Sequence, residues 1–174
     1  MKTTLYKQLA FAIVCLMFLG YNTGWAQAPF LEQVWLKSSY TWNTSSKCRD
    51  MDYYNGYLYV IDHASTTVRV INASTGNEDT SKNIFNSHFT GFCICIDGNG
   101  NKLVTENVYG MTNRFQASKM VGTTVTYLDS TASETGGRID YLDMYGNFNN
   151  GSGYIVGATT NTSDQISVWT FSNG

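Results

Sequence analysis

Residues 57–76 read YLYVIDHASTTVRVINASTG and carry the clearest structural signal in the chain. Within them, 57–62 and 67–72 are rich in Val, Ile and Tyr, the residue types that favour strands. The second of these segments alternates apolar and polar residues, as a strand with one buried face does. Asn55-Gly56 stands just before the first and suits the positive backbone φ of a tight hairpin. The segment therefore predicts antiparallel strands joined by short turns.

This pattern recurs along the chain with a period of about 45 residues. Cys48, Cys93 and Arg138 stand at equivalent positions, and each begins a strand-like segment. Four antiparallel strands within roughly 40–45 residues are typical of one blade of a β-propeller. The predicted repeat units are 47–91, 92–136 and 137–174.

The second and third units follow the pattern less closely. In the second unit we expect the third strand at 112–116 and the fourth at 123–128. In the third unit an insert at 147–153 delays the second strand, the third is expected at 165–169, and no fourth strand fits before the last residue. Residues 31–37 are expected to form one extra strand. The predicted fold is all-β: a partial β-propeller of about three blades of four antiparallel strands, the last incomplete, from the N-terminal portion of a longer protein.

The N-terminal residues predict an export signal. Lys2 and Lys7 precede the apolar run 9–19, and the small-residue segment 24–28 follows it. That order is typical of a secretory signal peptide, and the run is shorter than the roughly 20 residues that a membrane-spanning helix needs. We expect cleavage after Ala26, no transmembrane segment afterwards, and a secreted or periplasmic protein; the alternative is a buried N-terminal helix. The predicted divisions are a signal peptide, 1–26, and a propeller portion, 27–174.

Residues 57–76 resemble a blade of the YVTN/NHL-type β-propellers, whose usual form is xLYVxD, a short gap, and xVxVxDxxTG. The first unit is similar to this form throughout, the third in part and the second loosely. The whole chain also resembles the secreted, uncharacterised propeller proteins of Bacteroidetes. The resemblance implies the fold and says little about activity, because propellers host many unrelated functions.

Three cysteines follow the predicted cleavage point: Cys48, Cys93 and Cys95. An odd number excludes a complete set of intramolecular disulfides. Cys93 and Cys95 point to the same face if they lie on a strand, which would permit a metal pair. No nearby His or third Cys completes the usual set of four ligands. We therefore expect buried, apolar thiols and assign no metal ligands and no cofactor.

Charge and motifs exclude several functions. The formal net charge is −2 and only 14% of residues are charged, with no basic stripe that would neutralise phosphates. Nucleic-acid binding is therefore not expected. The chain has no G-x-S-x-G nucleophile motif and no phosphate-binding glycine loop.

Two segments with acidic residues remain as candidate sites. Residues 97–101, DGNGN, resemble the start of a calcium loop, but Lys102 and Val108 stand where that loop needs Gly and Glu, so a hairpin turn is favoured. The second group lies at the ends of first strands. Its carboxylates suit general acid–base chemistry or cation binding, whereas turn capping is the structural alternative. These residues are Asp50, Asp52, Asp140 and Asp143.

Aromatic residues at strand ends and in loops suggest ligand binding. Flat rings beside Asn and Asp suit sugars, which have apolar faces and polar rims; the alternative is packing between sheets. Trp42, Tyr54 and Tyr145 are the strongest surface candidates, and His63 lies in a loop of the kind where ligand groups gather. The predicted ligand-binding residues are Trp42, Tyr54, His63, Tyr145, Asp50 and Asp140.

The sequence favours a binding or scaffold module whose partner is a glycan or a cell-envelope protein. The alternative is a propeller hydrolase or lyase of the lactonase kind, with a metal at the channel mouth. That alternative expects acidic groups converging from every unit, yet the equivalent positions read Asp50, Cys95 and Asp140. Because the middle unit breaks the pattern, binding is favoured over catalysis and no catalytic residue is assigned.

Overall fold

The computed structural model describes residues 33–37, 40–42, 47–107, 115–128, 138–160 and 165–172. The chain divides into two units, Met1–Val34 and Trp35–Gly174, and every element below belongs to the second. The predicted signal peptide, 1–26, lies outside the described residues. Within the described residues, no helix is long and apolar enough to cross a membrane.

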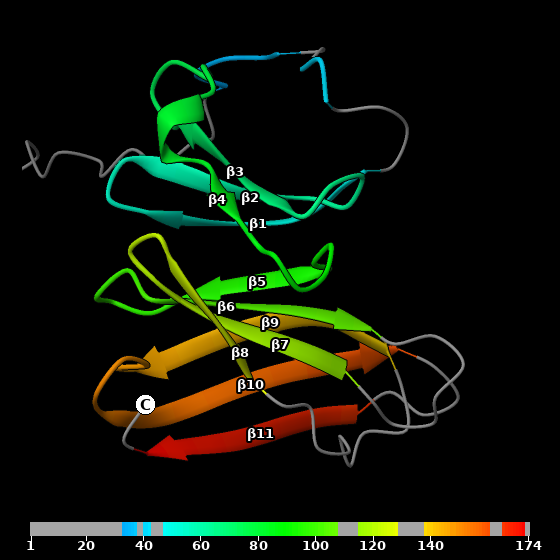
Figure 1. The fold of residues 1–174 in the computed structure, drawn as a ribbon, viewed down its shortest axis with the longest axis vertical. Helices are drawn as coiled ribbons and strands as arrows, with labels where there is room; N and C mark the ends of the chain where they lie inside the picture. Colours follow the sequence, from blue (N-terminus) through cyan, green and yellow to red (C-terminus); the bar gives the residue numbers. More distant parts are fainter. Residues whose placement is uncertain are drawn as a thin grey trace, which may run out of the picture. The chain divides into compact units, whose positions relative to one another are not determined.

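The first sheet contains four antiparallel strands in the order β1-β2-β3-β4 (Figure 1). The bounds predicted for β2 and β3 are confirmed. Asn55 and Gly56, which join β1 to β2, both have positive φ (47° and 84°), as the hairpin signal required. A short 3-10 turn, Thr80–Lys82, precedes β4. The strands are β1 Cys48–Tyr54, β2 Tyr57–Asp62, β3 Thr67–Asn72 and β4 Ile84–Phe85.

The second sheet has the same order, β5-β6-β7-β8, with four antiparallel strands. Its third strand was expected at 112–116, and this is wrong: β7 spans Phe115–Val121. The hairpin to β8 turns at Gly122, whose φ of 59° favours glycine, so this turn sets where β7 ends. The other strands are β5 Cys93–Ile96, β6 Lys102–Asn107 and β8 Thr124–Leu128.

The third sheet has three described strands in the order β11-β10-β9. They are β9 Arg138–Gly146, β10 Ser152–Thr160 and β11 Gln165–Ser172. The turn at 147–151 lies within the predicted insert. All three sheets are antiparallel, so the all-β, repeat-like architecture is established for the described part of the chain.

The extra strand expected at 31–37 is absent from its described part, residues 33–37. Trp35 is held by its side chain instead, because its Nε1 donates a hydrogen bond to the Ala73 carbonyl at 2.6 Å. Its ring also lies against Gly76, where an added Cβ would come within 2.9 Å of the indole. Residues 33–37 are therefore held to the turn after β3 by a side chain and do not form the predicted strand.

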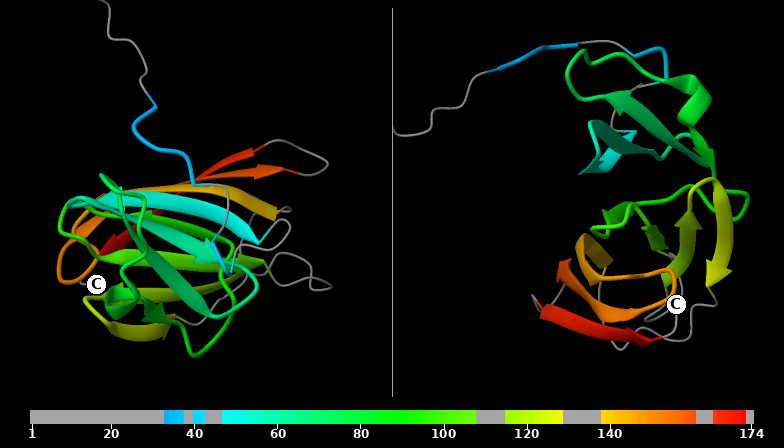
Figure 2. Two further views of the ribbon diagram at one scale, coloured as in Figure 1. Left: turned by 90° about the horizontal axis from the view of Figure 1, so that it is seen from above. Right: turned by 90° about the vertical axis from the view of Figure 1, so that its left-hand side faces the viewer.

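The core consists of two clusters, one on each face of the second sheet. The first joins Ile61 and Val68 of the first sheet to Ile94 and Met120 of the second. The other packs side chains of the second sheet, including Cys93 and Cys95, against β9 and the turn that follows it. The second sheet is therefore covered on both sides, as the middle layer of Figure 2.

The predicted burial of the two cysteines of β5 is confirmed. Cys93 and Cys95 are free and fully buried. Burial, together with the nearby charges of Asp50 and Asp140, raises the pKa of Cys93 to about 12. These thiols serve as small apolar side chains in the core.

Gly100, in the turn between β5 and β6, supplies a test of this packing. Its φ is 82°, and an added Cβ would come within 2.5 Å of the Tyr54 ring. We expect Gly100→Ala to lower the free energy of unfolding by about 1–2 kcal/mol for the backbone conformation and about 1–3 kcal/mol for overpacking. Urea denaturation measures this change.

Two other glycines provide matched controls. Gly122 has a positive φ but nothing within 4 Å of an added Cβ, and Gly98 also has open space there. Gly122→Ala should show only the backbone cost, about 1–2 kcal/mol, and Gly98→Ala should change stability by less than about 0.5 kcal/mol. Equal losses in Gly100→Ala and Gly122→Ala would contradict a packing role for Tyr54.

Candidate functional site

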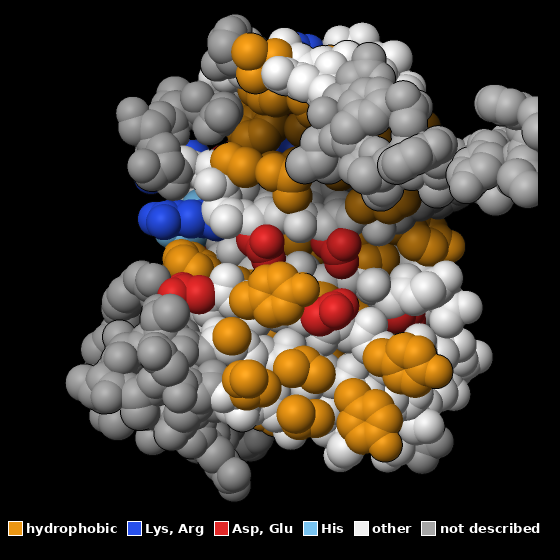
Figure 3. Space-filling model, turned by 180° about the vertical axis from the view of Figure 1, so that it is seen from behind, with side chains coloured by type: hydrophobic (Ala, Val, Ile, Leu, Met, Phe, Trp, Pro, Cys, Tyr) orange, Lys and Arg blue, Asp and Glu red, His pale blue; other side chains and the backbone are white. Residues whose placement is uncertain are grey.

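The acidic residues that the sequence singled out lie on strands β1 and β9, at the edges of their sheets. β1 contacts β5 and β5 contacts β9, so these three edge strands follow one another in space. The charges of Asp50, on β1, and Asp140, on β9, both act on Cys93 of β5. Figure 3 shows acidic side chains gathered among hydrophobic ones on this face. The structure therefore brings together two of the predicted site residues, Asp50 and Asp140.

The carboxylates of Asp50 and Asp52 join the first sheet to the second. Asp50 Oδ2 accepts a hydrogen bond from the N–H of Ile94 at 2.9 Å, and Asp52 Oδ2 accepts one from the N–H of Ile96 at 2.7 Å. Both donors belong to β5, an edge strand whose outward N–H groups have no neighbouring strand in the sheet. Burial raises the pKa of Asp50, although its backbone hydrogen bonds act in the opposite direction.

Between the second and third sheets, a thiol makes a hydrogen bond that corresponds to those of the carboxylates between the first and second. Cys93 Sγ donates a hydrogen bond to the Ile139 carbonyl of β9 at 3.3 Å. On β9, Asp143 Oδ1 accepts the N–H of Met144 at 2.7 Å, as Asp52 Oδ1 accepts the N–H of Tyr53 at 2.7 Å. The two aspartates thus share the same local conformation on different sheets.

Tyr141 of β9 is a site residue that the sequence did not select. Its side chain is 57% exposed, and the nearby charge of Asp143 raises its pKa, followed by desolvation and the charges of Asp52 and Asp50. Asp143 is exposed two residues further along β9, on the same face of the strand as Tyr141, and the charges of Asp52 and Asp50 on β1 also act on the ring. Its position between Asp140 and Asp143 was the available signal, but the distant carboxylates of β1 become neighbours only through the packing. We call Tyr141, Asp50, Asp52 and Asp143 the aromatic–acidic patch.

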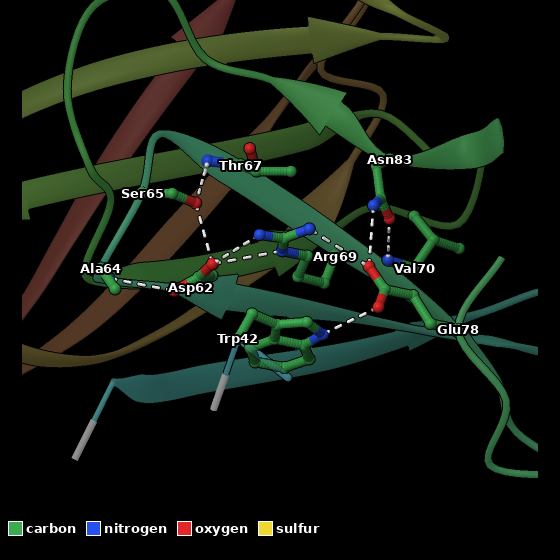
Figure 4. Close-up of polar contacts among 9 residues, drawn as sticks. All are labelled: Trp42, Asp62, Ala64, Ser65, Thr67, Arg69, Val70, Glu78 and Asn83. Atoms are coloured by element: carbon green, nitrogen blue, oxygen red, sulfur yellow. Dashed lines mark hydrogen bonds and ion pairs between the residues drawn. The ribbon is translucent and has the colours of Figure 1, made fainter. Parts of the chain in front are cut away.

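Trp42 lies over the face of the first sheet that is opposite to the face of Asp52 (Figure 4). Its Nε1 donates to Glu78 Oε2 at 2.8 Å, and the Arg69 guanidinium lies 5.4 Å from the ring centroid. Strand register places Arg69 opposite Val60, whereas Asp52 pairs with a residue of the alternate face. Trp42 is thus separated from the aromatic–acidic patch by the sheet itself.

Arg69 is the centre of the polar network in Figure 4. It contacts the buried Asp62 carboxylate at 2.9 Å and Glu78 at 3.3 Å. Tyr40 stacks on Trp42 with ring centroids 5.0 Å apart. Because the ring and its N–H are both engaged, Trp42 fastens residues 40–42 onto the first sheet.

The remaining predicted residues occupy separate places. Tyr54 is half-buried, with its ring against the turn at Gly100. The Nδ1 of His63 lies 3.0 Å from the Gly91 carbonyl and 3.4 Å from a carboxylate oxygen of Glu106. Tyr145 is exposed on the third sheet and shares β9 with Asp140.

The turn at 97–101 is a hairpin turn, as predicted. Asp97 is buried, and its carboxylate accepts two backbone N–H groups within the turn, from Asn99 at 2.8 Å and Asn101 at 2.9 Å. It also accepts the Asn101 side-chain amide at 2.8 Å and the N–H of Phe148, before β10, at 2.7 Å. Burial alone raises the pKa of Asp97, but these hydrogen bonds outweigh it and lower the pKa below its usual value. The carboxylate therefore caps the turn and links it to the third sheet.

Metal binding has little support in the part of the chain that the structure describes. No group of three or more His, Cys, Asp or Glu residues there is arranged to hold a metal ion.

Lys102, which follows the turn at 97–101, is buried. Its side chain donates a hydrogen bond to the Gly100 carbonyl at 2.8 Å, and its burial lowers its pKa.

A matched pair of variants tests the bridging role of Asp52. Asp52→Ala leaves the Ile96 N–H without its acceptor, which should lower the free energy of unfolding by about 1–3 kcal/mol. Asp143→Ala removes the same local bond to the following N–H, and among the described residues Asp143 makes no hydrogen bond to another sheet, so the change should cost only about 0.5–1 kcal/mol. Denaturant titration measures the free energy of unfolding of both variants. Equal decreases in this free energy would rule out a bridge between the sheets at Asp52.

The lowered pKa of Asp97 gives a pH dependence with a defined sign. A carboxyl whose pKa is lower in the folded chain stabilises the fold above its unfolded pKa, near 3.8, and loses this contribution as pH falls through the folded value. Asp97→Asn should lower stability by about 1.5–3 kcal/mol near neutral pH. The difference from the unmodified chain should shrink below pH 3.8.

The measurement is the free energy of unfolding as a function of pH. Asp79→Asn is the control, because Asp79 makes a partly exposed ion pair with Lys82 at 3.9 Å and should change stability by less than about 0.5 kcal/mol. A difference for Asp97→Asn that stays constant into acid would show that the ionised form is not what the fold stabilises.

Comparison with known proteins leaves the family open. The chain matches no protein-family model, and no curated protein is significantly similar to it. The resemblance to YVTN/NHL-type propellers therefore stays a prediction, carried by residues 57–76.

Proposed function

We propose that this chain is a secreted or periplasmic β-propeller module that binds a glycan through the aromatic–acidic patch. Three antiparallel sheets with a repeated strand order support the propeller. The order of charge, apolar run and small residues at the N-terminus supports export. The protein acts by binding and holds its ligand without converting it.

One observation carries the choice of ligand: an exposed tyrosine ring shares one face of β9 with the exposed carboxylate of Asp143. Tyr141 is solvent-exposed on β9, and the charges of Asp143, Asp52 and Asp50 all act on it. A sugar ring has an apolar face that packs on an aromatic ring. It also has hydroxyl groups, which donate hydrogen bonds to carboxylate oxygens. The patch offers both kinds of contact at one place.

The hydrogen bonds of the patch favour binding over catalysis. Asp50 and Asp52 each use one oxygen for the following N–H and the other for an N–H of β5. Carboxylates held in this way are fixed acceptors, whereas a general acid must exchange a proton with its substrate. The lactonase-like alternative lacks a comparable observation in its favour among the described residues.

A glycan array probed with the purified chain tests the proposal. Tyr141→Ala should weaken binding to the retained glycans about tenfold, since an aromatic contact contributes roughly 0.5–1.5 kcal/mol beyond the area it buries. Tyr154→Ala is the control, because Tyr154 is similarly exposed (52% against 57%) and lies on β10. Equal binding by both variants would refute the patch, and release of cleaved sugar would favour an enzyme.

A further inference from the structure

Lys102 is a buried cation without a paired anion. It lies on β6, and only 4% of its surface is exposed. Its Nζ donates to the Gly100 carbonyl at 2.8 Å and lies 4.3 Å from the centroid of the Tyr59 ring, but it makes no ion pair with any described residue. Lysines are almost never fully buried unless they are paired, because moving a charge out of water is costly. An ammonium has three N–H donors, so Lys102 retains donors for a further partner.

The carboxylate of Asp97 does not serve as this partner. Its charge acts on Lys102, yet its two oxygens already accept N–H donors from Asn99, Asn101 and Phe148. Burial of Lys102 outweighs the charge of Asp97 and lowers the pKa of the lysine. The Lys102 ammonium therefore needs a negative group from outside the described part of the chain.

Three tyrosines of the first sheet lie beside Lys102. Tyr57 and Tyr59 share one face of β2, and strand register pairs Tyr54 of β1 with Tyr57. This face is turned toward the second sheet, since Tyr59 packs against the core cluster between the two sheets. The Tyr54 ring lies against Gly100, whose carbonyl also accepts the Lys102 ammonium. The turn between β1 and β2 thus lies beside the turn between β5 and β6 (Figure 1).

The hydroxyl groups of these tyrosines are not used within the described part of the chain. All three side chains are half-buried, and none of the hydroxyls makes a hydrogen bond to a described residue. The hydroxyls reach solvent, because the one fully buried side-chain polar atom without a partner among the described residues belongs to Asn86. Burial raises the pKa of Tyr59, followed by the charges of Tyr54 and Tyr57, so its hydroxyl stays protonated and can donate.

A second ammonium flanks the tyrosines. Lys82 Nζ lies 5.3 Å from the centroid of the Tyr57 ring. Its side chain is 47% exposed, and it makes a long ion pair with Asp79, at 3.9 Å. Ammonium and phenol donors therefore gather at one end of the junction between the first and second sheets. We call Tyr54, Tyr57, Tyr59, Lys82 and Lys102 the tyrosine–lysine site.

We propose that the tyrosine–lysine site binds an oxyanion, a group of the carboxylate, sulfate or phosphate kind. Such a group accepts several hydrogen bonds at once, and hydrogen bonds to ionised groups are about twice as strong as neutral ones. It gives Lys102 the negative partner that the described residues do not supply. The tyrosine rings add an apolar surface for a sugar that carries the anionic group. The site shares no residue with the aromatic–acidic patch, so this proposal does not depend on the proposed function.

Isothermal titration calorimetry with the purified chain tests the proposal. The probes are sodium sulfate and sodium glucuronate, with glucose as the uncharged control, in a chloride buffer of constant ionic strength. The unmodified chain should bind at least one of the two oxyanions. Lys102→Met removes the ammonium and keeps a long unbranched side chain, so it should weaken this binding roughly tenfold or more. Tyr59→Phe removes one hydroxyl and keeps the ring, and it should weaken binding about tenfold.

Lys119→Met is the matched control. Lys119 Nζ also donates to a backbone carbonyl, that of Asn149 at 3.0 Å, and lies 5.5 Å from the centroid of an aromatic ring, that of Phe148. Strand register pairs Lys119 with Leu103, which packs in the core cluster toward the third sheet. Because Lys119 lies outside the tyrosine–lysine site, Lys119→Met should bind oxyanions as the unmodified chain does.

The outcomes separate the possible ligands. Tighter binding of glucuronate than of sulfate would identify an acidic sugar as the ligand, and the reverse would identify a free anion. The proposal is wrong if the unmodified chain binds neither oxyanion, or if Tyr59→Phe and a folded Lys102→Met bind as tightly as Lys119→Met. Glucose binding that Lys102→Met weakens equally would also overturn it, because the site would then not select charge. Circular dichroism shows which variants fold, and Tyr59→Phe decides alone if Lys102→Met does not.

The two binding proposals are read by different measurements. The glycan array with Tyr141→Ala reports on the aromatic–acidic patch, whereas the titration of Lys102→Met reports on the tyrosine–lysine site. Either proposal can therefore fail without the other.

Discussion

The whole architecture depends on satisfying the N–H groups of edge strands that lie between sheets. β5 ends its own sheet, and the carboxylates of Asp50 and Asp52 reach from β1 to accept the N–H groups of Ile94 and Ile96. A buried N–H without an acceptor costs about 1–3 kcal/mol, so apolar packing alone would not hold two such edges together. Acidic side chains on a first strand thus have a structural use, which explains their place in a chain with few charges.

The second sheet makes the two neighbouring sheets dependent on each other. Its two faces contribute to different core clusters, and Asp97, in its first turn, also accepts the N–H of Phe148 before β10. Removing either neighbour would expose one of its apolar faces to water. Polar and apolar contacts therefore act together at each junction, the polar ones setting the register and the apolar ones supplying most of the burial.

Strand type and position followed from the sequence wherever local signals were strong. The bounds of β2 and β3 and the Asn55-Gly56 hairpin were predictable because alternation and turn chemistry are local. β7 was misplaced because its position was inferred from the repeat, while a turn at Gly122 determines it. The site was harder to predict from the sequence. The acidic strand ends were identified, but their role as hydrogen-bond acceptors and the effect of their charges on Tyr141 depend on packing between strands far apart in the chain.

The burial of Cys93 and Cys95 has a consequence for their reaction with oxidants. Oxidation and disulfide exchange proceed through the thiolate, and a pKa of about 12 keeps Cys93 protonated at ordinary pH. Burial also excludes the reagents themselves. The folded chain is therefore chemically inert at these sulfurs, whereas an unfolded molecule exposes two neighbouring thiols that can be trapped in a disulfide. Folding therefore protects these two thiols, and their oxidation requires that the sheets around them open first.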